Sequence, residues 1–190
     1  DLNGDGYHDI IVGAPRFDGS RADEGRVFLY YGAANDSIRA SGNDTFHQGV
    51  TNYYATRGSS SGNPSDYFGH SVAGVRDVNG DGFDEVLMGL PRANLSAYRS
   101  GLVALYKGSN MGVESEPWMV LGSEMTSKTY FGEDLLVADF DSDGFIDLGV
   151  IAQSSDIGGT NKGALLIYGG QAGDPPFDPD PSIITGKDRF

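Results

Sequence analysis

Short apolar runs alternate with polar, glycine-rich segments along the whole chain. Three of these runs follow a glycine and end in a tyrosine, at residues 25–30, 101–106 and 163–168. Runs this short are typical of β-strands, because a helix with one buried face needs a longer amphipathic stretch. The pattern therefore predicts many short strands joined by tight turns, and the chain has 29 glycines, which such turns favour.

The runs belong to a unit that occurs three times. The opening stretch DLNGDGYHDIIVGAP returns as DVNGDGFDEVLMGLP from Asp77 and as DFDSDGFIDLGVIAQ from Asp139. In each copy the glycine and the tyrosine of the apolar run follow the first aspartate at the same spacing, and Phe-Gly pairs at residues 68–69 and 131–132 precede the second and third copies. Self-similarity of this kind is the signature of a repeat architecture.

Each unit is expected to form one four-stranded antiparallel sheet. Short apolar runs around Trp118 and Ile183 lie between a tyrosine run and the next Phe-Gly pair, and they are the expected fourth strands. The predicted units are residues 1–67, which lack the first strand and carry a long inserted loop with one strand near Tyr53 to Thr56; residues 68–130; and residues 131–190, which end at the start of a fourth unit at Phe190.

An acidic, glycine-broken loop opens each unit. Oxygen-bearing side chains stand at positions 1, 3, 5 and 9 of every loop, and a glycine follows position 5. Because alternate side chains point inward around a tight turn, such a loop can form a cage of oxygens for a hard cation such as calcium. The candidate ligands are Asp1, Asn3, Asp5 and Asp9 in the first loop, Asp77, Asn79, Asp81 and Glu85 in the second, and Asp139, Asp141, Asp143 and Asp147 in the third.

Position 7 of the loops is aromatic in every copy, as Tyr7, Phe83 and Phe145. Its backbone carbonyl is a further candidate ligand, whereas its ring is expected to pack on neighbouring apolar side chains.

Other readings of the loops fit less well. An EF-hand needs a glutamate at position 12, where this chain has Val12, Met88 and Val150, and a β-branched run follows instead of a helix. Zinc and copper are poor fits without histidine or cysteine, and magnesium is second to calcium because it dehydrates reluctantly. Solvated Asp-Gly hairpin turns remain the alternative, which the threefold spacing disfavours. About three Ca²⁺ ions are expected, one for each loop.

These residues resemble the FG-GAP repeat, the blade unit of the integrin α-subunit β-propeller, which also occurs in phospholipase D enzymes that act on glycosylphosphatidylinositol anchors. The Phe-Gly pairs match its FG. Its GAP is Gly13-Ala14-Pro15, which becomes Gly89-Leu90-Pro91 in the second copy and Ile151-Ala152-Gln153 in the third. The resemblance covers nearly the whole chain.

The resemblance implies an all-β fold, a partial β-propeller of about three blades of four-stranded antiparallel sheet. It also implies calcium binding through the side chains at loop positions 1, 3, 5 and 9 and the carbonyl at position 7. Because the propellers of this family close with more blades, the chain is expected to be a fragment of a longer protein or one part of an assembly.

The charge and composition of the chain limit the kinds of partner that it can be expected to bind. A formal net charge of −14, with only 13 lysines and arginines, argues against a nucleic-acid partner. No apolar stretch approaches the roughly 18 residues that a transmembrane helix needs, so no transmembrane segment is expected in this piece. The absence of cysteine excludes disulfides and thiolate chemistry. The absence of cysteine does not fix the compartment, and the resemblance implies an extracellular or cell-surface protein.

The expected function is a scaffold, adhesion or protein-interaction role without enzymatic activity, through a protein or glycan partner or self-association. Two alternatives stay open: an accessory propeller domain of a secreted, phospholipase D-like hydrolase, and a subunit of a self-assembling surface fibre. A GSSSG stretch around Ser60 lacks the strand and helix of a nucleophile elbow. Sequons at Asn35, Asn43 and Asn94 are candidate glycosylation sites.

Overall fold

The computed structural model describes residues 1–19, 22–32, 34, 66–94, 97–122, 128–157, 160 and 162–185, and the backbone alone of residues 48–51. Every regular element in these residues is a β-strand, and strand pairing within the sheets is antiparallel. None of the described segments forms an apolar helix long enough to cross a bilayer. The described chain is therefore all-β, as the sequence predicts.

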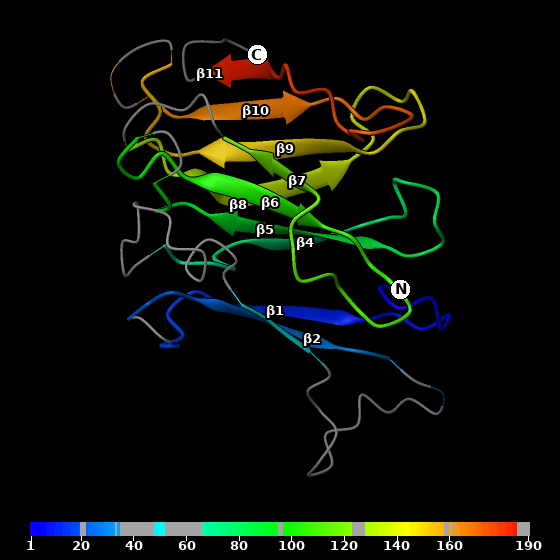
Figure 1. Cartoon of the computed structure of the whole chain (residues 1–190). Coiled ribbons are helices and arrows are strands. Elements are labelled where there is room, and N and C mark those ends of the chain that lie inside the picture. The colour runs from blue at the N-terminus through cyan, green and yellow to red at the C-terminus, as the bar shows by residue number, and fades with distance from the viewer. Residues whose placement is uncertain are drawn as a thin grey trace.

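Three sheets follow one another along the chain (Figure 1). The first has the order β1 (Ile10–Ala14), β2 (Arg26–Tyr30), β3 (Gln48–Thr51). The second has the order β4 (Val72–Val75), β5 (Glu85–Leu90), β6 (Leu102–Tyr106), β7 (Met119–Leu121). The third has the order β8 (Phe131–Ala138), β9 (Asp147–Ala152), β10 (Ala164–Tyr168), β11 (Ser182–Thr185). Four-stranded antiparallel sheets are thus confirmed for the second and third units, and the unit boundaries remain predictions.

The three sheets share one register. The strand after the acidic loop pairs with the tyrosine strand so that Ile10 faces Tyr30, Val86 faces Tyr106 and Leu148 faces Tyr168. Because side chains alternate along a strand, this shared register places equivalent residues on the same face of each sheet.

The sheets pack face to face, and this stacking forms the core (Figure 1). Side chains of the first and second sheets form one apolar cluster, and side chains of the second and third sheets form another. Among the described residues, only the middle sheet therefore has both faces covered, and every residue of β5 and β6 is buried. In β2 and β10, buried and half-buried residues alternate, because one face of each outer sheet is open. The arrangement is consistent with a partial propeller.

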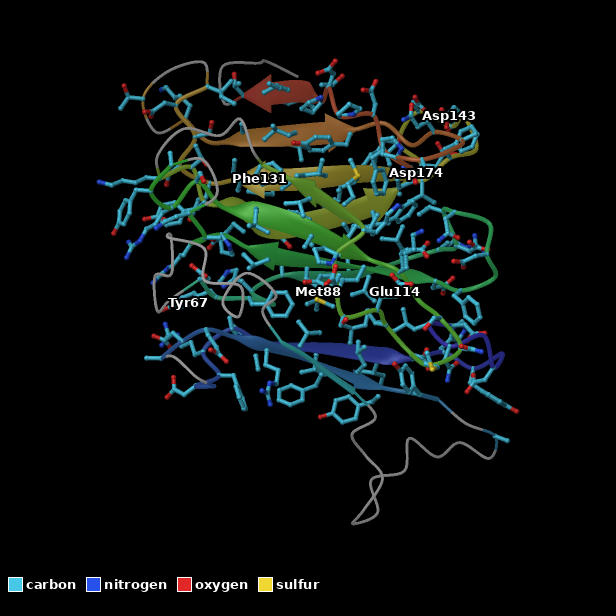
Figure 2. All side chains as sticks on the ribbon, in the orientation of Figure 1. Tyr67, Met88, Glu114, Phe131, Asp143 and Asp174 are labelled. Atoms are coloured by element: carbon cyan, nitrogen blue, oxygen red, sulfur yellow. The ribbon has the colours of Figure 1, made fainter. Side chains whose placement is uncertain are left out.

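The Phe-Gly pair joins each sheet to the one before it. Phe131 is fully buried (Figure 2), and its N–H donates to the carbonyl of Ser100 at 3.2 Å, just before the tyrosine strand of the preceding unit. Phe68 makes the equivalent bond to Glu24 at 3.2 Å. Each phenylalanine also meets the strand-ending tyrosine of its own sheet edge-on; the ring centroids of Phe131 and Tyr168 lie 6.2 Å apart.

The long inserted loop is described only in part. A third strand is present, but it spans Gln48–Thr51, just before the predicted strand near Tyr53 to Thr56. The predicted range lies outside the described residues, as do Ser60, Asn35, Asn43 and Phe190.

Candidate metal centre

The three acidic loops, residues 1–9, 77–85 and 139–147, lie at the same end of the stacked sheets (Figures 1 and 2). Each loop leads into the strand that pairs with the tyrosine strand, namely β1, β5 or β9. The shared register therefore brings equivalent carboxylates to equivalent places. Below, these segments are called the first, second and third loops.

Each loop is wound around the carboxylate at position 1. In the third loop, Asp139 accepts the N–H of Asp143 at 3.1 Å through Oδ1 and the N–H of Gly144 at 3.0 Å through Oδ2. Asp1 and Asp77 accept the equivalent pairs of N–H groups in their own loops. These bonds orient the carboxylate and tighten the turn.

The side chains at positions 3 and 5 are held in the same way. Asp141 Oδ1 accepts the N–H of Asp143 at 3.1 Å, and Asp143 Oδ1 accepts the N–H of Phe145 at 2.8 Å. The equivalent bonds form in the first and second loops. The glycine after position 5 has φ between 87° and 95° in all three loops, a conformation that side chains with a Cβ rarely adopt.

The residue at position 9 ties the loop to the body of its sheet. Asp147 Oδ2 accepts the N–H of Phe140 at 2.7 Å, and its Oδ1 accepts the N–H of Gly170, beyond the tyrosine strand, at 2.7 Å. Asp9 makes the matching two bonds in the first unit. Gly170 and its equivalents Gly32 and Gly108, two residues beyond each tyrosine, lie against the loop backbone, where a Cβ would clash.

The second loop has the longer Glu85 at this position, and it is fully buried. Its Oε2 accepts the N–H of Val78 at 2.9 Å, and its Oε1 accepts the Asn79 side-chain N–H at 3.2 Å. Burial raises the pKa of Glu85 to about 7, and the negative charges of Asp81, Asp77 and Asp84 add to the rise. A cation bound in this loop would favour the ionised carboxylate of Glu85, and so would oppose the effects of burial and of the neighbouring negative charges on its pKa.

In the third loop the carboxylates converge. Asp139, Asp141 and Asp147 each offer an oxygen atom, and these atoms lie within 4.8 Å of one another. In the other two loops position 3 is an asparagine, whose amide N–H donates to the carboxylate at position 5, at 3.1 Å from Asn3 to Asp5 and at 2.8 Å from Asn79 to Asp81. Positions 3 and 5 are therefore adjacent in these loops too. An all-oxygen donor set of this kind fits a hard divalent cation.

The rings at position 7 depart in part from the sequence expectation. Phe83 is half-buried and packs beside Gly4 of the first loop. The expectation of packing is wrong for Tyr7 and Phe145, which are each 42% exposed.

Sequence reasoning missed Asp84. Its carboxylate accepts the N–H of Asp77 at 3.1 Å, and its own N–H donates to the carbonyl of Asp1 at 3.0 Å. Position 8 of the loop is His8, Asp84 or Ile146, so the repeat gives no signal there.

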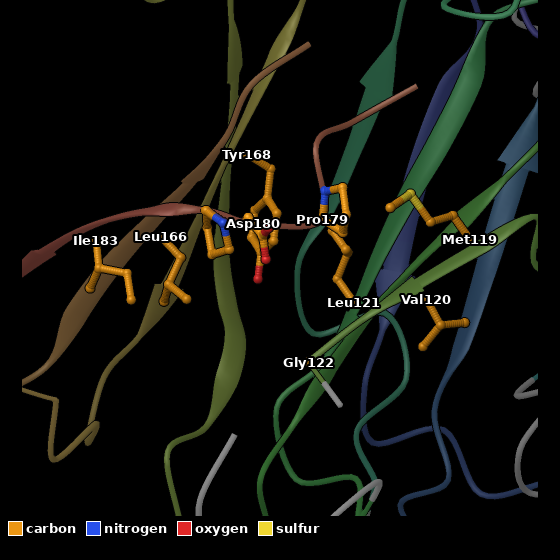
Figure 3. Close-up of a pocket in the computed structure, with 10 residues that line it drawn as sticks. Met119, Val120, Leu121, Gly122, Leu166, Tyr168, Pro179, Asp180 and Ile183 are labelled. Atoms are coloured by element: carbon orange, nitrogen blue, oxygen red, sulfur yellow. The ribbon is translucent and has the colours of Figure 1, made fainter. Parts of the chain in front are cut away.

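Two further cavities lie away from the loops. One of about 270 Å³ lies between β7 and the β10–β11 hairpin (Figure 3), and Asp180 is the one charged residue among the described residues that line it. The other, of about 260 Å³, holds His70, which pairs with Glu133 at 3.3 Å, but no serine, threonine or cysteine is among its described lining residues. Neither cavity has a serine, threonine or cysteine beside a base among its described lining residues.

The FG-GAP repeat family model matches residues 1–30 and 68–106. The chain is 31% identical over 159 residues to "Integrin alpha-6" of Gallus gallus, and the aligned residues cover 83% of this chain and 13% of that protein. It is 31% identical over 181 residues to "Integrin alpha-8" of Mus musculus, covering 88% of this chain and 14% of that protein.

A relative of another kind is "Phosphatidylinositol-glycan-specific phospholipase D" of Bos taurus, 32% identical over 171 residues, covering 88% of this chain and 19% of that protein. The chain thus spans less than a fifth of the length of these relatives. The family match covers the acidic loops of the first two units and strands β1, β2, β4, β5 and β6, and the chain belongs to the family of proteins that carry FG-GAP repeats.

Proposed function

We propose that this chain is a calcium-stabilised segment of a β-propeller in an extracellular or cell-surface protein, and that it serves adhesion or protein interaction without enzymatic activity of its own. The similarity to integrin α chains supports the role and the location. The observation that carries the proposal is the convergence of three carboxylates in a loop that recurs in register on three stacked sheets.

The proposed ligands are the side chains at positions 1, 3, 5 and 9 and the carbonyl at position 7 of each loop. They are Asp1, Asn3, Asp5, Tyr7 and Asp9; Asp77, Asn79, Asp81, Phe83 and Glu85; and Asp139, Asp141, Asp143, Phe145 and Asp147. Bound calcium would neutralise the clustered carboxylates and hold each loop closed. The backbone N–H groups that already orient these carboxylates reduce the ordering that a cation must impose.

The open faces of the outer sheets support the propeller part of the proposal. Ile10 and Val12 of β1 are 40% and 42% exposed, whereas Val86 and Met88, at the same repeat positions in β5, are fully buried against the first sheet. We infer that another repeat unit of a longer protein covers this face of β1 and β2.

Thermal unfolding with calcium, magnesium or a chelator tests the proposal. Calcium at ten times the dissociation constant stabilises the folded state by about 1.4 kcal/mol for each site. The melting temperature is therefore expected to rise with calcium, to rise less with magnesium, and to fall with a chelator. An unchanged melting temperature, together with no calcium bound in a calorimetric titration, would contradict the calcium assignment.

The phospholipase D relative supports a second candidate, an accessory propeller domain of a hydrolase. The two candidates differ in what the longer protein contains. Hydrolysis of a glycosylphosphatidylinositol anchor by the longer protein, and not by this segment, would favour the second candidate. Binding of a protein partner without hydrolysis would favour the first.

A further inference from the structure

The first loop is docked on the second through backbone hydrogen bonds. The N–H of Asp84 donates to the carbonyl of Asp1 at 3.0 Å, and the N–H of Ser109 donates to the carbonyl of Leu2 at 3.2 Å. The Leu2 side chain is only 2% exposed and belongs to the core between the first and second sheets. The start of the first loop is therefore fixed by residues of the second unit.

A side-chain contact adds to these bonds. Gly4 lies so close to Phe83 that a Cβ built on it would be 2.7 Å from Cε1 of that ring. Phe83 is position 7 of the second loop, between the proposed ligands Asp81 and Glu85. The surface on which the first loop rests is thus part of the second candidate site.

The second and third loops lack this docking among the described residues. Gly80, which is equivalent to Gly4, has no atom within 4 Å of a built Cβ. Gln171, which is equivalent to Ser109, donates its N–H to Pro176 of its own unit at 2.9 Å. A cavity of about 270 Å³ lies between Asp77 and Val78 on one side and Phe145, Gln171 and Pro176 on the other.

We propose that the first and second loops bind calcium as a coupled pair and that the third loop binds it independently. This rests on the proposed function, in which all three loops are calcium sites. A cation held by Asp81, Glu85 and the Phe83 carbonyl fixes the segment between them, which contains the Asp84 N–H and the Phe83 ring. The first loop then finds its docking surface already ordered, so each ion favours the other.

Repulsion between two bound dications acts in the opposite direction. The sign of the measured coupling therefore separates the two effects. If the docked backbone couples the two sites, calcium at one site raises the affinity of the other. If repulsion alone acts, calcium at one site lowers the affinity of the other.

Loop knock-outs test the proposal on the whole 190-residue chain, with calcium as the probe and calorimetry as the measurement. Asp81→Ala removes the second site, and it is expected to weaken the first site about fivefold. Asp5→Ala is expected to weaken the second site by the same factor, because coupling between two binding sites is reciprocal. Asp143→Ala, the matched change in the third loop, is expected to leave both affinities unchanged. All three aspartates are exposed, so folding is expected to survive each change.

A second test removes the contact without removing a ligand. Phe83→Ala keeps the backbone carbonyl and the Cβ but takes away the ring beside Gly4, and it is expected to weaken the first site, whose own residues are unaltered. Phe145→Ala is the control, since that ring is 42% exposed. Phe83→Tyr keeps an aromatic ring beside Gly4, and it is expected to leave the calcium affinity of the first site unchanged.

The outcomes separate the two proposals. The coupling would be overturned if the sites that remain in the Asp81→Ala, Asp5→Ala and Phe83→Ala proteins bind calcium as tightly as they do in the unaltered chain. That result would leave the calcium assignment intact. Equal effects of Asp81→Ala and Asp143→Ala on the first site would also overturn it. Failure of the unaltered chain to bind calcium at all would overturn the proposed function itself.

Discussion

The glycine before each tyrosine strand is required by the close approach of the next repeat. Gly101 has φ of 79°, and a Cβ built on it would lie 2.2 Å from the carbonyl oxygen of Phe131. Gly25 has the same geometry against Phe68. Two recurring features of this chain, the glycine before the tyrosine strand and the Phe-Gly pair of the next unit, therefore form one contact between sheets.

Replacement of this glycine should be strongly destabilising. Gly101→Ala adds a clash with backbone to the strain of a positive φ, so we expect a loss of about 3 kcal/mol or more in the free energy of unfolding. Gly173→Ala is the control, since Gly173 also has positive φ but has nothing within 4 Å of a built Cβ; it should show only the cost of the positive φ, about 1–2 kcal/mol. Equal losses in urea unfolding of the two variants would contradict the clash.

The buried Glu85 gives the metal-free protein a dependence on pH. Its pKa is raised to about 7, so between pH 4.5 and pH 7 the folded state binds more protons than the unfolded state. Stability should therefore fall as pH rises through this window, by on the order of 3 kcal/mol in total. Urea unfolding in chelator at pH 5 and pH 8 measures the fall.

Glu85→Gln is the control for this effect. It has no charge to bury, so its unfolding free energy should lack the part of the pH dependence that Glu85 contributes. A fall of the same size in both proteins would assign the effect to other groups. Saturating calcium should reduce the fall in the unaltered protein, because a cation favours the ionised carboxylate.

Most strand positions could be predicted because the strands have counterparts at the same place in another unit. The tyrosine strands and the strands after the acidic loops recur at fixed spacing, and the structure has them in one register. The inserted loop differs in length from the connections of the other units, and there the described strand is Gln48–Thr51, while the predicted range near Tyr53 to Thr56 lies outside the described residues. In the loops, positions 1, 3, 5 and 9 repeat and could be named, whereas position 8 does not repeat, so neither the bond that the Asp84 carboxylate accepts nor the one that its backbone N–H donates could be found from the sequence.

Burial of a strand, in contrast, depends on its neighbours and could not be read from the repeat. Position 12 is Val12 in β1 and Val150 in β9, on the same face of equivalent strands. Val150 is fully buried against the second sheet, and Val12 is 42% exposed.

The same substitution, valine to alanine, is expected to lower the free energy of unfolding by different amounts at Val150 and Val12. Val150→Ala should cost about 2 kcal/mol, through lost apolar burial and the cavity left behind. Val12→Ala should cost about 0.5 kcal/mol or less, as is usual for an exposed site. Urea unfolding of the two variants measures both values, and a cost for Val12→Ala equal to that of Val150→Ala would mean that its face is covered in this segment.

At the scale of the whole molecule, the same two variants test whether the stack continues. If a further repeat of a longer protein packs on the first sheet, Val12 takes the environment that Val150 has here. Val12→Ala should then cost about 2 kcal/mol in the longer protein, while it costs little in the 190-residue segment. Val150→Ala should cost the same in both, because its neighbours are already present. A cost for Val12→Ala that stays small in the longer protein would mean that the open face of β1 and β2 is not a site of sheet packing, and the propeller would have to be given up.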